Sequence, residues 1–215
     1  MKSDISDYRK SYLKGFLSEN EIFDNPLKLF KKWFDEISEN NFEIEINAMT
    51  LSTIDNDGFP RNRVVLLKYF SDEGFTFFTN YNSNKAKSIL NINKVSLSFF
   101  WEKMERQIII KGRAFKTTDD ISDKYFNSRP LGSKIGALVS SNQSSVIPSR
   151  SFLEDKFEKV KKQFENTNIS RPINWGGFIV KPIEYEFWQG RENRLHDRIR
   201  YNKKDKKWII ERLSP

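Results

Sequence analysis

Residues 48–79 decide the fold, and they read AMTLSTIDNDGFPRNRVVLLKYFSDEGFTFFT. From Ala48 onward apolar and polar side chains alternate with a period of two, which is typical of a strand with one buried face. The DNDG sequence at 55–58 is a strong turn signal, and residues 63–70 are the predicted returning strand. A second turn at 71–74 leads to a third strand over 75–79. The stretch therefore predicts a β-meander.

The flanking sequence adds helices and more short strands. Asn25 and Pro26 predict a helix start, since asparagine caps and proline fits the first turn. Its expected apolar face comprises Leu27, Phe30, Trp33, Phe34 and Ile37. Further strands are expected over 95–101, 107–115, 176–181, 185–189 and 207–212. Helices are expected over 83–90, 117–127 and 149–164, with an apolar stretch at 135–139 and a polar loop at 140–149. This order predicts the α+β class, mainly β, with a barrel.

Composition narrows the function. The chain has 215 residues, which suits a single domain over 25–215 preceded by an N-terminal arm over 1–24. It has no cysteine and one histidine, His196, so disulfides, thiolate chemistry and a multi-histidine metal site are excluded. No apolar run approaches the roughly 20 residues of a membrane span, and the start MKSD is unlike a signal peptide. A cytoplasmic protein without a resident metal is expected.

The formal net charge of +8 leaves two interpretations open. A basic surface can attract nucleic acid, but lysines and arginines are spread along this chain and mixed with acids. The densest basic stretch, 191–207, itself contains Glu192, Asp197 and Asp205. We therefore expect the cations to converge on anionic small molecules and expect neither nucleic acid nor membrane as the main partner.

Two segments combine a strand with cations. In the strand beginning at Arg63, side chains alternate between faces, so Arg63 and Lys68 lie on opposite faces at opposite ends. Both can bind an anion, or both can simply be exposed at the strand ends. In the second segment, 78–85, backbone amides between a strand and a helix start can hold an anion and Lys85 adds charge, although an ordinary polar turn has the same pattern.

Two later segments group polar side chains on one face. Tyr125 and Arg129 are four residues apart on a helix, and with Ser133 they form a plausible phosphomonoester clamp; a basic helix end is the alternative. If 194–198 is extended, Arg194, His196 and Arg198 point the same way, beside Trp188. Such a row of cations is costly unless an anion or acid neutralises it.

Together these four segments, in this order, resemble the pyridoxamine 5′-phosphate oxidase family from about Tyr8 to Pro215. The closing stretch WIIERLSP resembles that family's C-terminus. The resemblance implies a split β-barrel homodimer with two FMN at the subunit interface. It also implies oxidation of pyridoxamine and pyridoxine 5′-phosphate to pyridoxal 5′-phosphate, with dioxygen reduced to hydrogen peroxide and ammonia released from the amine.

The resemblance also implies roles for particular residues. Arg194 and His196 would act on the substrate ring as catalytic groups; Arg9 and Tyr12 would form a lid; and Lys68, Tyr125, Arg129 and Ser133 would bind the substrate. Lys68 would also bind FMN, together with Arg63, Val64, Leu66, Leu67, Phe78, Thr79, Asn84, Lys85, Gln107, Gln143, Ser144, Trp188 and Arg198. Asn84 and Phe78 depart from the family, which often has arginine and tyrosine there, and loss of the arginine removes one charge-assisted contact.

Three other functions remain open at this point. A non-catalytic flavin or phosphate binder needs no substrate clamp. A split-barrel flavin reductase would use a nicotinamide cofactor, although the chain has no Gly-rich dinucleotide fingerprint. A nucleic-acid binder should show steep salt dependence and no flavin colour.

Overall fold

A computed structural model describes residues 3–40, 42, 44–164 and 167–215. Residues 1 and 2 of the predicted arm thus lie outside the described residues. The helices are α1 (Pro26–Glu39), α2 (Asn84–Asn91), α3 (Asp119–Ser128), α4 (Leu131–Val139) and α5 (Arg150–Gln163), with 3-10 turns at Glu19–Glu21, Glu102–Met104 and Glu192–Arg194. None of these described helices is both long and apolar enough to cross a membrane.

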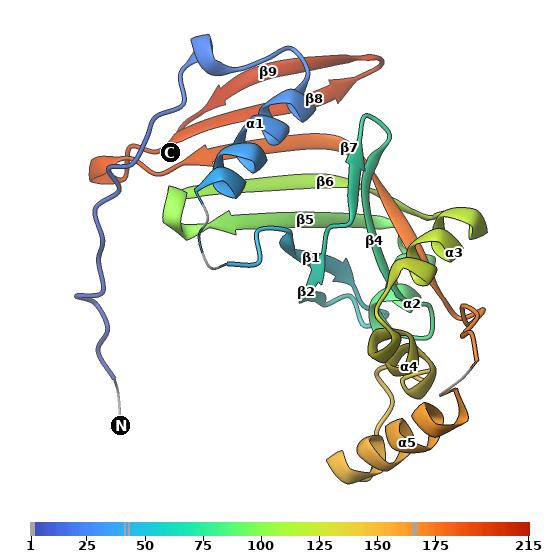
Figure 1. Cartoon of the computed structure of the whole chain (residues 1–215). Coiled ribbons are helices and arrows are strands. Elements are labelled where there is room, and N and C mark those ends of the chain that lie inside the picture. Colours follow the sequence, from blue (N-terminus) through green and yellow to red (C-terminus); the bar gives the residue numbers. More distant parts are fainter. Residues whose placement is uncertain (1–2, 41, 43, 165–166) are drawn as a thin grey trace. The chain divides into compact units, whose positions relative to one another are not determined.

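The strands are β1 (Ala48–Ile54), β2 (Pro60–Leu66), β3 (Tyr69–Ser71), β4 (Gly74–Asn80), β5 (Lys94–Trp101), β6 (Arg106–Lys116), β7 (Trp175–Gln189), β8 (Asp197–Lys204) and β9 (Lys207–Leu213) (Figure 1). Their hydrogen-bonded order is β2-β1-β5-β6-β7-β4-β3, with β8 beside β7 and β9 beside β8. The predicted meander is present, and β1 buries Met49, Leu51 and Thr53 as its period of two requires.

The chain divides into two compact units. Unit 1 comprises residues 1–50, 97–111 and 182–215, and unit 2 comprises residues 51–96 and 112–181. Segments of the two units alternate along the chain. Four strands contribute residues to both units: β1, β5, β6 and β7. The predicted boundary between an arm over 1–24 and one domain over 25–215 stays a prediction.

Unit 1 is built around α1 and the β8–β9 hairpin, which is long and regular in Figure 1. The Asn25 side chain accepts a hydrogen bond from the Leu27 amide at 2.9 Å, which confirms the predicted cap. Trp33 meets Phe187 edge to face at 5.3 Å between ring centroids. The predicted apolar face needs one correction: Leu29 is fully buried, whereas Leu27 is only half-buried.

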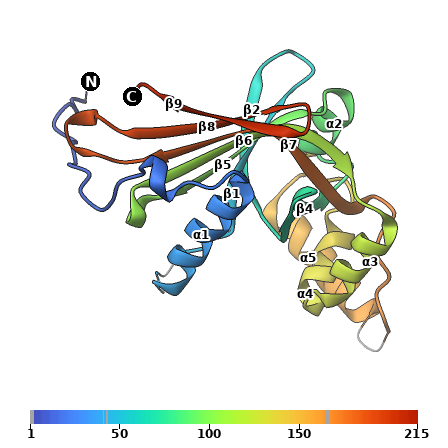
Figure 2. The ribbon, with the colours of Figure 1, turned by 90° about the horizontal axis from the view of Figure 1, so that it is seen from above.

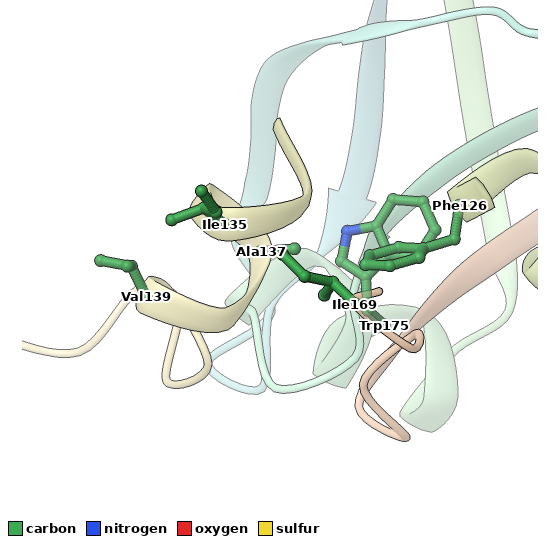
Figure 3. Packing of buried hydrophobic residues seen from close by; sticks show 6 residues of the cluster. All are labelled: Phe126, Ile135, Ala137, Val139, Ile169 and Trp175. Carbon is green, nitrogen blue, oxygen red and sulfur yellow. The ribbon is translucent and has the colours of Figure 1, made fainter. Parts of the chain in front are cut away.

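Unit 2 places α3, α4 and α5 together, as both ribbon views show (Figures 1 and 2). Its helical core contains the buried residues Phe126, Ile135, Ala137, Val139, Ile169 and Trp175. Phe126 and Trp175 lie against one another, with ring centroids 5.2 Å apart (Figure 3). The stretch 135–139 is therefore the buried end of helix α4, which begins at Leu131.

Two predictions about where strands begin and end were wrong. The strand expected over 63–70 is two strands, β2 and β3, because the chain leaves its partner β1 and pairs with β4 after Leu67. The two strands expected at 176–181 and 185–189 are one strand, β7. Pro182 is tolerated within it because its missing N–H falls between the ladder to β4, which ends at Val180, and the ladder to β8, which starts at Glu184.

Strand β8 was missed, because only Ile199 and Tyr201 are buried in its charged sequence DRIRYNKK. The hypothesis of an extended 194–198 segment was wrong at its start. Arg194 closes a 3-10 turn with φ of 62°, so it does not continue the face of β8.

Candidate functional site

Unit 2 contains a pocket of about 600 Å³ between β2, β4, α3 and α4. The described residues of its lining include three cations, Lys68, Lys85 and Arg129, and no aspartate or glutamate. Ten of the residues predicted from the sequence line it together: Val64, Leu66, Lys68, Phe78, Thr79, Lys85, Tyr125, Arg129, Ser133 and Gln143. A cavity with this lining is suited to an anion, because its positive charges have no acid beside them.

Arg129 is the best-defined cation of this pocket. It caps the C-terminus of α3, where its backbone N–H donates to the Phe126 carbonyl at 3.2 Å. Its guanidinium carbon lies 4.7 Å from the centroid of the Trp175 ring and 5.7 Å from that of Phe126. Its Nη1 is buried and lacks a hydrogen-bond partner in the described structure. Burial lowers the pKa of Arg129 from its ordinary value, since desolvation disfavours the charged form.

An aromatic wall forms one side of the pocket. Phe78 from β4 stacks on Tyr125 from α3 at 4.1 Å between centroids, and on Trp175 from β7 at 5.6 Å. The Lys68 ammonium lies 5.9 Å from the Tyr125 ring centroid. These rings exclude water from one side of the cavity, which strengthens interactions between the cations and a bound anion.

Lys85 lies in the first turn of α2 and lines another part of the pocket. Its Nζ lies 3.4 Å from the Thr79 hydroxyl oxygen, so ammonium and hydroxyl can contact the same anion. Burial, and secondarily the positive charge of Arg63, lower the pKa of Lys85 from its ordinary value. Both effects show a cation that the protein alone does not fully stabilise.

The loop after α4 is held in place by asparagines that the sequence analysis did not single out. Asn80 donates to the Ser140 carbonyl at 2.8 Å, and Asn174 donates to the Ser141 carbonyl at 2.7 Å. Ser144 has φ of 75° and its hydroxyl accepts from the Asn84 amide at 3.3 Å. The loop carries Gln143 into the pocket lining. Only long-range pairing reveals these asparagines, since each is an ordinary turn residue in the sequence.

Unit 1 contains a second pocket, of about 660 Å³, beside the end of β7. It brings together five of the predicted residues: Arg9, Tyr12, Trp188, Arg194 and His196. The Tyr12 ring contacts Trp188 at 5.6 Å and His196 at 5.7 Å between centroids. The arm and the C-terminal segment, far apart in the sequence, thus form one aromatic and cationic surface.

His196 is oriented by the backbone. Its Nδ1 accepts a hydrogen bond from the Arg191 amide at 3.1 Å, so the neutral ring carries its proton on Nε2. Burial and then the charge of Arg194 lower the pKa of His196, while Asp197 opposes the shift. A lowered pKa favours the neutral imidazole, which offers one N–H donor.

The remaining predicted residues line neither pocket. Arg63 donates to the Thr53 hydroxyl at 2.7 Å, and Arg198 donates to Glu186 at 2.9 Å. Leu67 is buried in unit 2, and Gln107 is half-buried on β6 in unit 1. Asn84 is exposed at the start of α2, and Ser144 lines a neighbouring apolar pocket. Their roles toward a cofactor stay predictions.

Comparison with known proteins agrees with this geometry. Residues 37–164 match the family model "Pyridoxamine 5'-phosphate oxidase", and residues 175–215 match "Pyridoxine 5'-phosphate oxidase C-terminal dimerisation region". The chain belongs to the pyridoxamine 5′-phosphate oxidase family. The predicted enzyme class, an oxidoreductase, is thereby confirmed, and the dimerisation region supports a homodimer.

Relatives of similar length share much of this chain's sequence. The pyridoxine/pyridoxamine 5′-phosphate oxidase of Flavobacterium johnsoniae is 58% identical over 213 residues, covering 99% of each chain. That of Christiangramia forsetii is 48% identical over the full length of both.

Solved structures confirm the predicted split β-barrel. PhzG from Burkholderia lata, in complex with tetrahydrophenazine-1-carboxylic acid, aligns with a TM-score of 0.86 at 25% identity, covering 93% of this chain and 98% of that one. An FMN-binding protein related to pyridoxamine 5′-phosphate oxidase from Nostoc punctiforme aligns with a TM-score of 0.69 at 15% identity, covering 90% and 100%.

Proposed function

We propose that the protein oxidises pyridoxamine 5′-phosphate and pyridoxine 5′-phosphate to pyridoxal 5′-phosphate, with FMN as cofactor. Dioxygen accepts the two electrons and becomes hydrogen peroxide, and water releases ammonia from the amine substrate. One observation carries the proposal: among the described residues, the pocket of unit 2 has no acidic side chain in its lining, and the buried Arg129 Nη1 has no hydrogen-bond partner. A buried cationic donor is costly without an acceptor, and a phosphate supplies one.

The residues of this pocket suit FMN. Thr79 near the end of β4 and Lys85 in the first turn of α2 would hold the phosphate of the cofactor, since their side chains lie together. Val64 and Leu66 would face the flat ring with apolar side chains, and Gln143 would add a polar contact. When bound, FMN supplies the two-electron acceptor that no amino-acid side chain provides.

The other end of the pocket would bind the substrate phosphate. Arg129 offers a planar pair of donors, Ser133 and Tyr125 offer hydroxyls, and Lys68 adds a positive charge. Because Arg129 is held against Trp175, its donors are ordered before the substrate arrives. Preorganised donors place the substrate with little loss of conformational freedom on binding.

Arg194 and His196 would act on the pyridine ring. The neutral imidazole can donate from Nε2, and the guanidinium can stabilise negative charge that develops in the transition state. His196 would therefore position the substrate rather than remove a proton. Arg9 and Tyr12 would cover the ring from the arm, because they line the same pocket as these two residues.

The homodimer brings further residues into the proposal. We place the two FMN at the subunit interface, so that residues of the dimerisation region, including Trp188 and Arg198, complete each flavin site. Gln107 from β6, together with Arg63, Leu67, Asn84 and Ser144, would add the remaining flavin contacts. A cytoplasmic location also remains a prediction from the sequence.

The visible spectrum of the purified protein tests the function. We expect a yellow protein with flavin absorbance, which bleaches when pyridoxamine 5′-phosphate is added without oxygen. Readmission of oxygen should restore the colour and release one hydrogen peroxide per pyridoxal 5′-phosphate. Pyridoxamine without its phosphate is the control and should bleach the protein far less, since it lacks the group that the pocket binds.

Two outcomes would contradict this proposal. A yellow protein that the phosphorylated substrates do not bleach would be a flavin-binding module or, if a nicotinamide cofactor bleaches it, a flavin reductase. A protein that binds no FMN under any condition would remove the cofactor from the site altogether.

A further inference from the structure

Glu105 is a buried acid that the proposed chemistry does not use. Its side chain is 2% exposed, and its backbone has the left-handed φ of 54° that ends the 3-10 turn Glu102–Met104 before β6. One carboxylate oxygen, Oε2, accepts hydrogen bonds from the Leu13 amide at 2.8 Å and from the Lys14 amide at 2.9 Å. A carboxylate is buried at such a position only when strong donors replace its water.

The backbone of the same residue is bound to the end of β7. The Glu105 carbonyl accepts from the Gly190 amide at 2.7 Å and from the Gln189 side chain at 3.2 Å. Glu105 therefore joins two segments of unit 1: the arm at residues 13 and 14, and the strand end next to Trp188. Both links join residues far apart in the sequence: Leu13 and Glu105 are 92 positions apart, and Gln189 and Glu105 are 84 positions apart.

The hydrogen bonds of Glu105 position Tyr12, which directly precedes Leu13 and Lys14 in the arm. A Cβ atom added at Gly190 would lie only 2.8 Å from Tyr12 Cγ and 3.1 Å from Glu105 Cβ. The arm thus runs as close to the end of β7 as a glycine permits. With its backbone held there, the Tyr12 ring sits against Trp188 and His196.

A second carboxylate holds the arm farther along. Asp197 accepts from the Leu17 amide at 3.1 Å, but it also pairs with Arg191 and Arg212 at 2.8 Å each. The described hydrogen bonds of the Glu105 carboxylate come instead from the arm itself. Glu105 is therefore the anchor adjacent to Tyr12, and Asp197 fixes the arm five residues later.

We propose that Glu105 is a positioning residue that anchors the N-terminal arm so that Arg9 and Tyr12 cover the pocket containing Arg194 and His196. This proposal rests on the proposed function for its effect on substrate. An anchored arm loses less conformational entropy when it closes over a bound substrate, so the anchor lowers KM. Chemistry after closure involves the same groups with or without the anchor, so kcat should change little.

The test is the pair Glu105→Ala and Glu105→Gln in the FMN-loaded enzyme. We expect Glu105→Ala to raise the KM for pyridoxamine 5′-phosphate about tenfold, the scale of a lost charge-assisted hydrogen bond, with kcat within about twofold. Glu105→Gln keeps an acceptor oxygen and should show a smaller rise. FMN content should stay unchanged in both, and if the alanine variant does not fold, the glutamine variant carries the test.

Glu102→Ala is the matched control. Glu102 lies in the same 3-10 turn and also faces the arm, with its carboxylate 3.8 Å from the Lys10 ammonium. Both side chains are more than half exposed, and such pairs contribute little. The KM of Glu102→Ala should therefore remain within about twofold of the wild-type value. An equal rise in KM for Glu102→Ala would show that any charge near the arm has this effect, and would overturn the anchor.

A second readout does not depend on turnover. Trypsin can cut the arm after Arg9, Lys10 or Lys14, and we expect faster cleavage there in Glu105→Ala than in the wild type or in Glu102→Ala. In a Tyr12→Ala background, the further change Glu105→Ala should add little to KM, because the anchor acts through the arm. Unchanged cleavage and unchanged KM would overturn the proposal. Faster cleavage in a protein without oxidase activity would keep the anchor and overturn the proposed function instead.

Discussion

The Arg129 guanidinium lies over the Trp175 ring, with 4.7 Å between its central carbon and the ring centroid. Trp175 is buried and stacks in turn on Phe78, so the cation rests on a rigid aromatic surface. Together with the buried Nη1 atom that has no described partner, this arrangement fixes a donor before any ligand is present.

Arg129→Lys tests whether charge alone suffices in the phosphate pocket. Lysine keeps the charge but loses the planar pair of donors and most of the contact with Trp175. We expect KM for both phosphorylated substrates to rise by about 10- to 100-fold, the range of one charge-assisted hydrogen bond, with FMN still bound. Steady-state kinetics on enzyme of measured FMN content checks this. A variant with wild-type KM would place the substrate phosphate elsewhere.

FMN affinity should fall as pH rises, and the reason is Lys85. Its pKa in the free protein lies below the ordinary value through burial and the nearby charge of Arg63. Above that lowered pKa, binding of the phosphate must first reprotonate the ammonium, so Kd should increase by up to about tenfold per pH unit. Quenching of FMN fluorescence between pH 7 and 10 measures the slope. Lys85→Gln should bind more weakly and lose this dependence.

Arg194→Ala and Lys68→Ala should separate turnover from binding. Removal of Arg194 removes a charge proposed to act in the transition state, so kcat should drop by about 100-fold while FMN stays bound. Lys68→Ala should chiefly raise KM and weaken FMN, since Lys68 lines the pocket of unit 2. Rapid mixing without oxygen gives the rate of flavin bleaching for each variant. Full turnover in FMN-loaded Arg194→Ala would contradict the assigned role.

Gly190→Ala should disturb the arm and, through Tyr12, the pocket of unit 1, although Gly190 itself lines neither pocket. The added methyl group would sit 2.8 Å from Tyr12 Cγ, closer than atoms normally approach, so the tyrosine must move away from Trp188. We expect a KM rise of several-fold with unchanged FMN content, and faster proteolysis of the arm. Gly132→Ala is a suitable control, because an added Cβ there meets nothing within 4 Å.

Tyr201 makes a stability prediction that depends on pH. Burial raises the pKa of Tyr201 to about 12, and its hydroxyl donates to the Phe23 carbonyl at 2.9 Å. A raised folded-state pKa means that the neutral phenol stabilises the fold below pH 10, and that this contribution is lost between pH 10 and 12. Tyr201→Phe should cost about 1 kcal/mol at pH 8, and the difference should reverse by pH 11.5. Urea unfolding of the wild type and of Tyr201→Phe at pH 8 and at pH 11.5 measures this difference in the free energy of unfolding.

The sequence by itself determined the features that depend on neighbouring residues. The cap of Asn25, the alternation in β1 and the grouping of Tyr125, Arg129 and Ser133 around one pocket were all predictable, because dihedral preferences and side-chain periodicity act over a few residues. The family resemblance added Arg9 and Tyr12, which no local pattern would place in one pocket with Arg194 and His196.

Only the tertiary structure decided what depends on distant segments. It joined β7 into one strand through two different partners and placed Trp175 beneath Arg129. It also brought Glu105 to the arm across 92 positions. No local preference encodes these contacts, since a buried carboxylate or a mid-strand proline is stable only when a remote segment supplies the missing donors or leaves the missing N–H unpaired without cost.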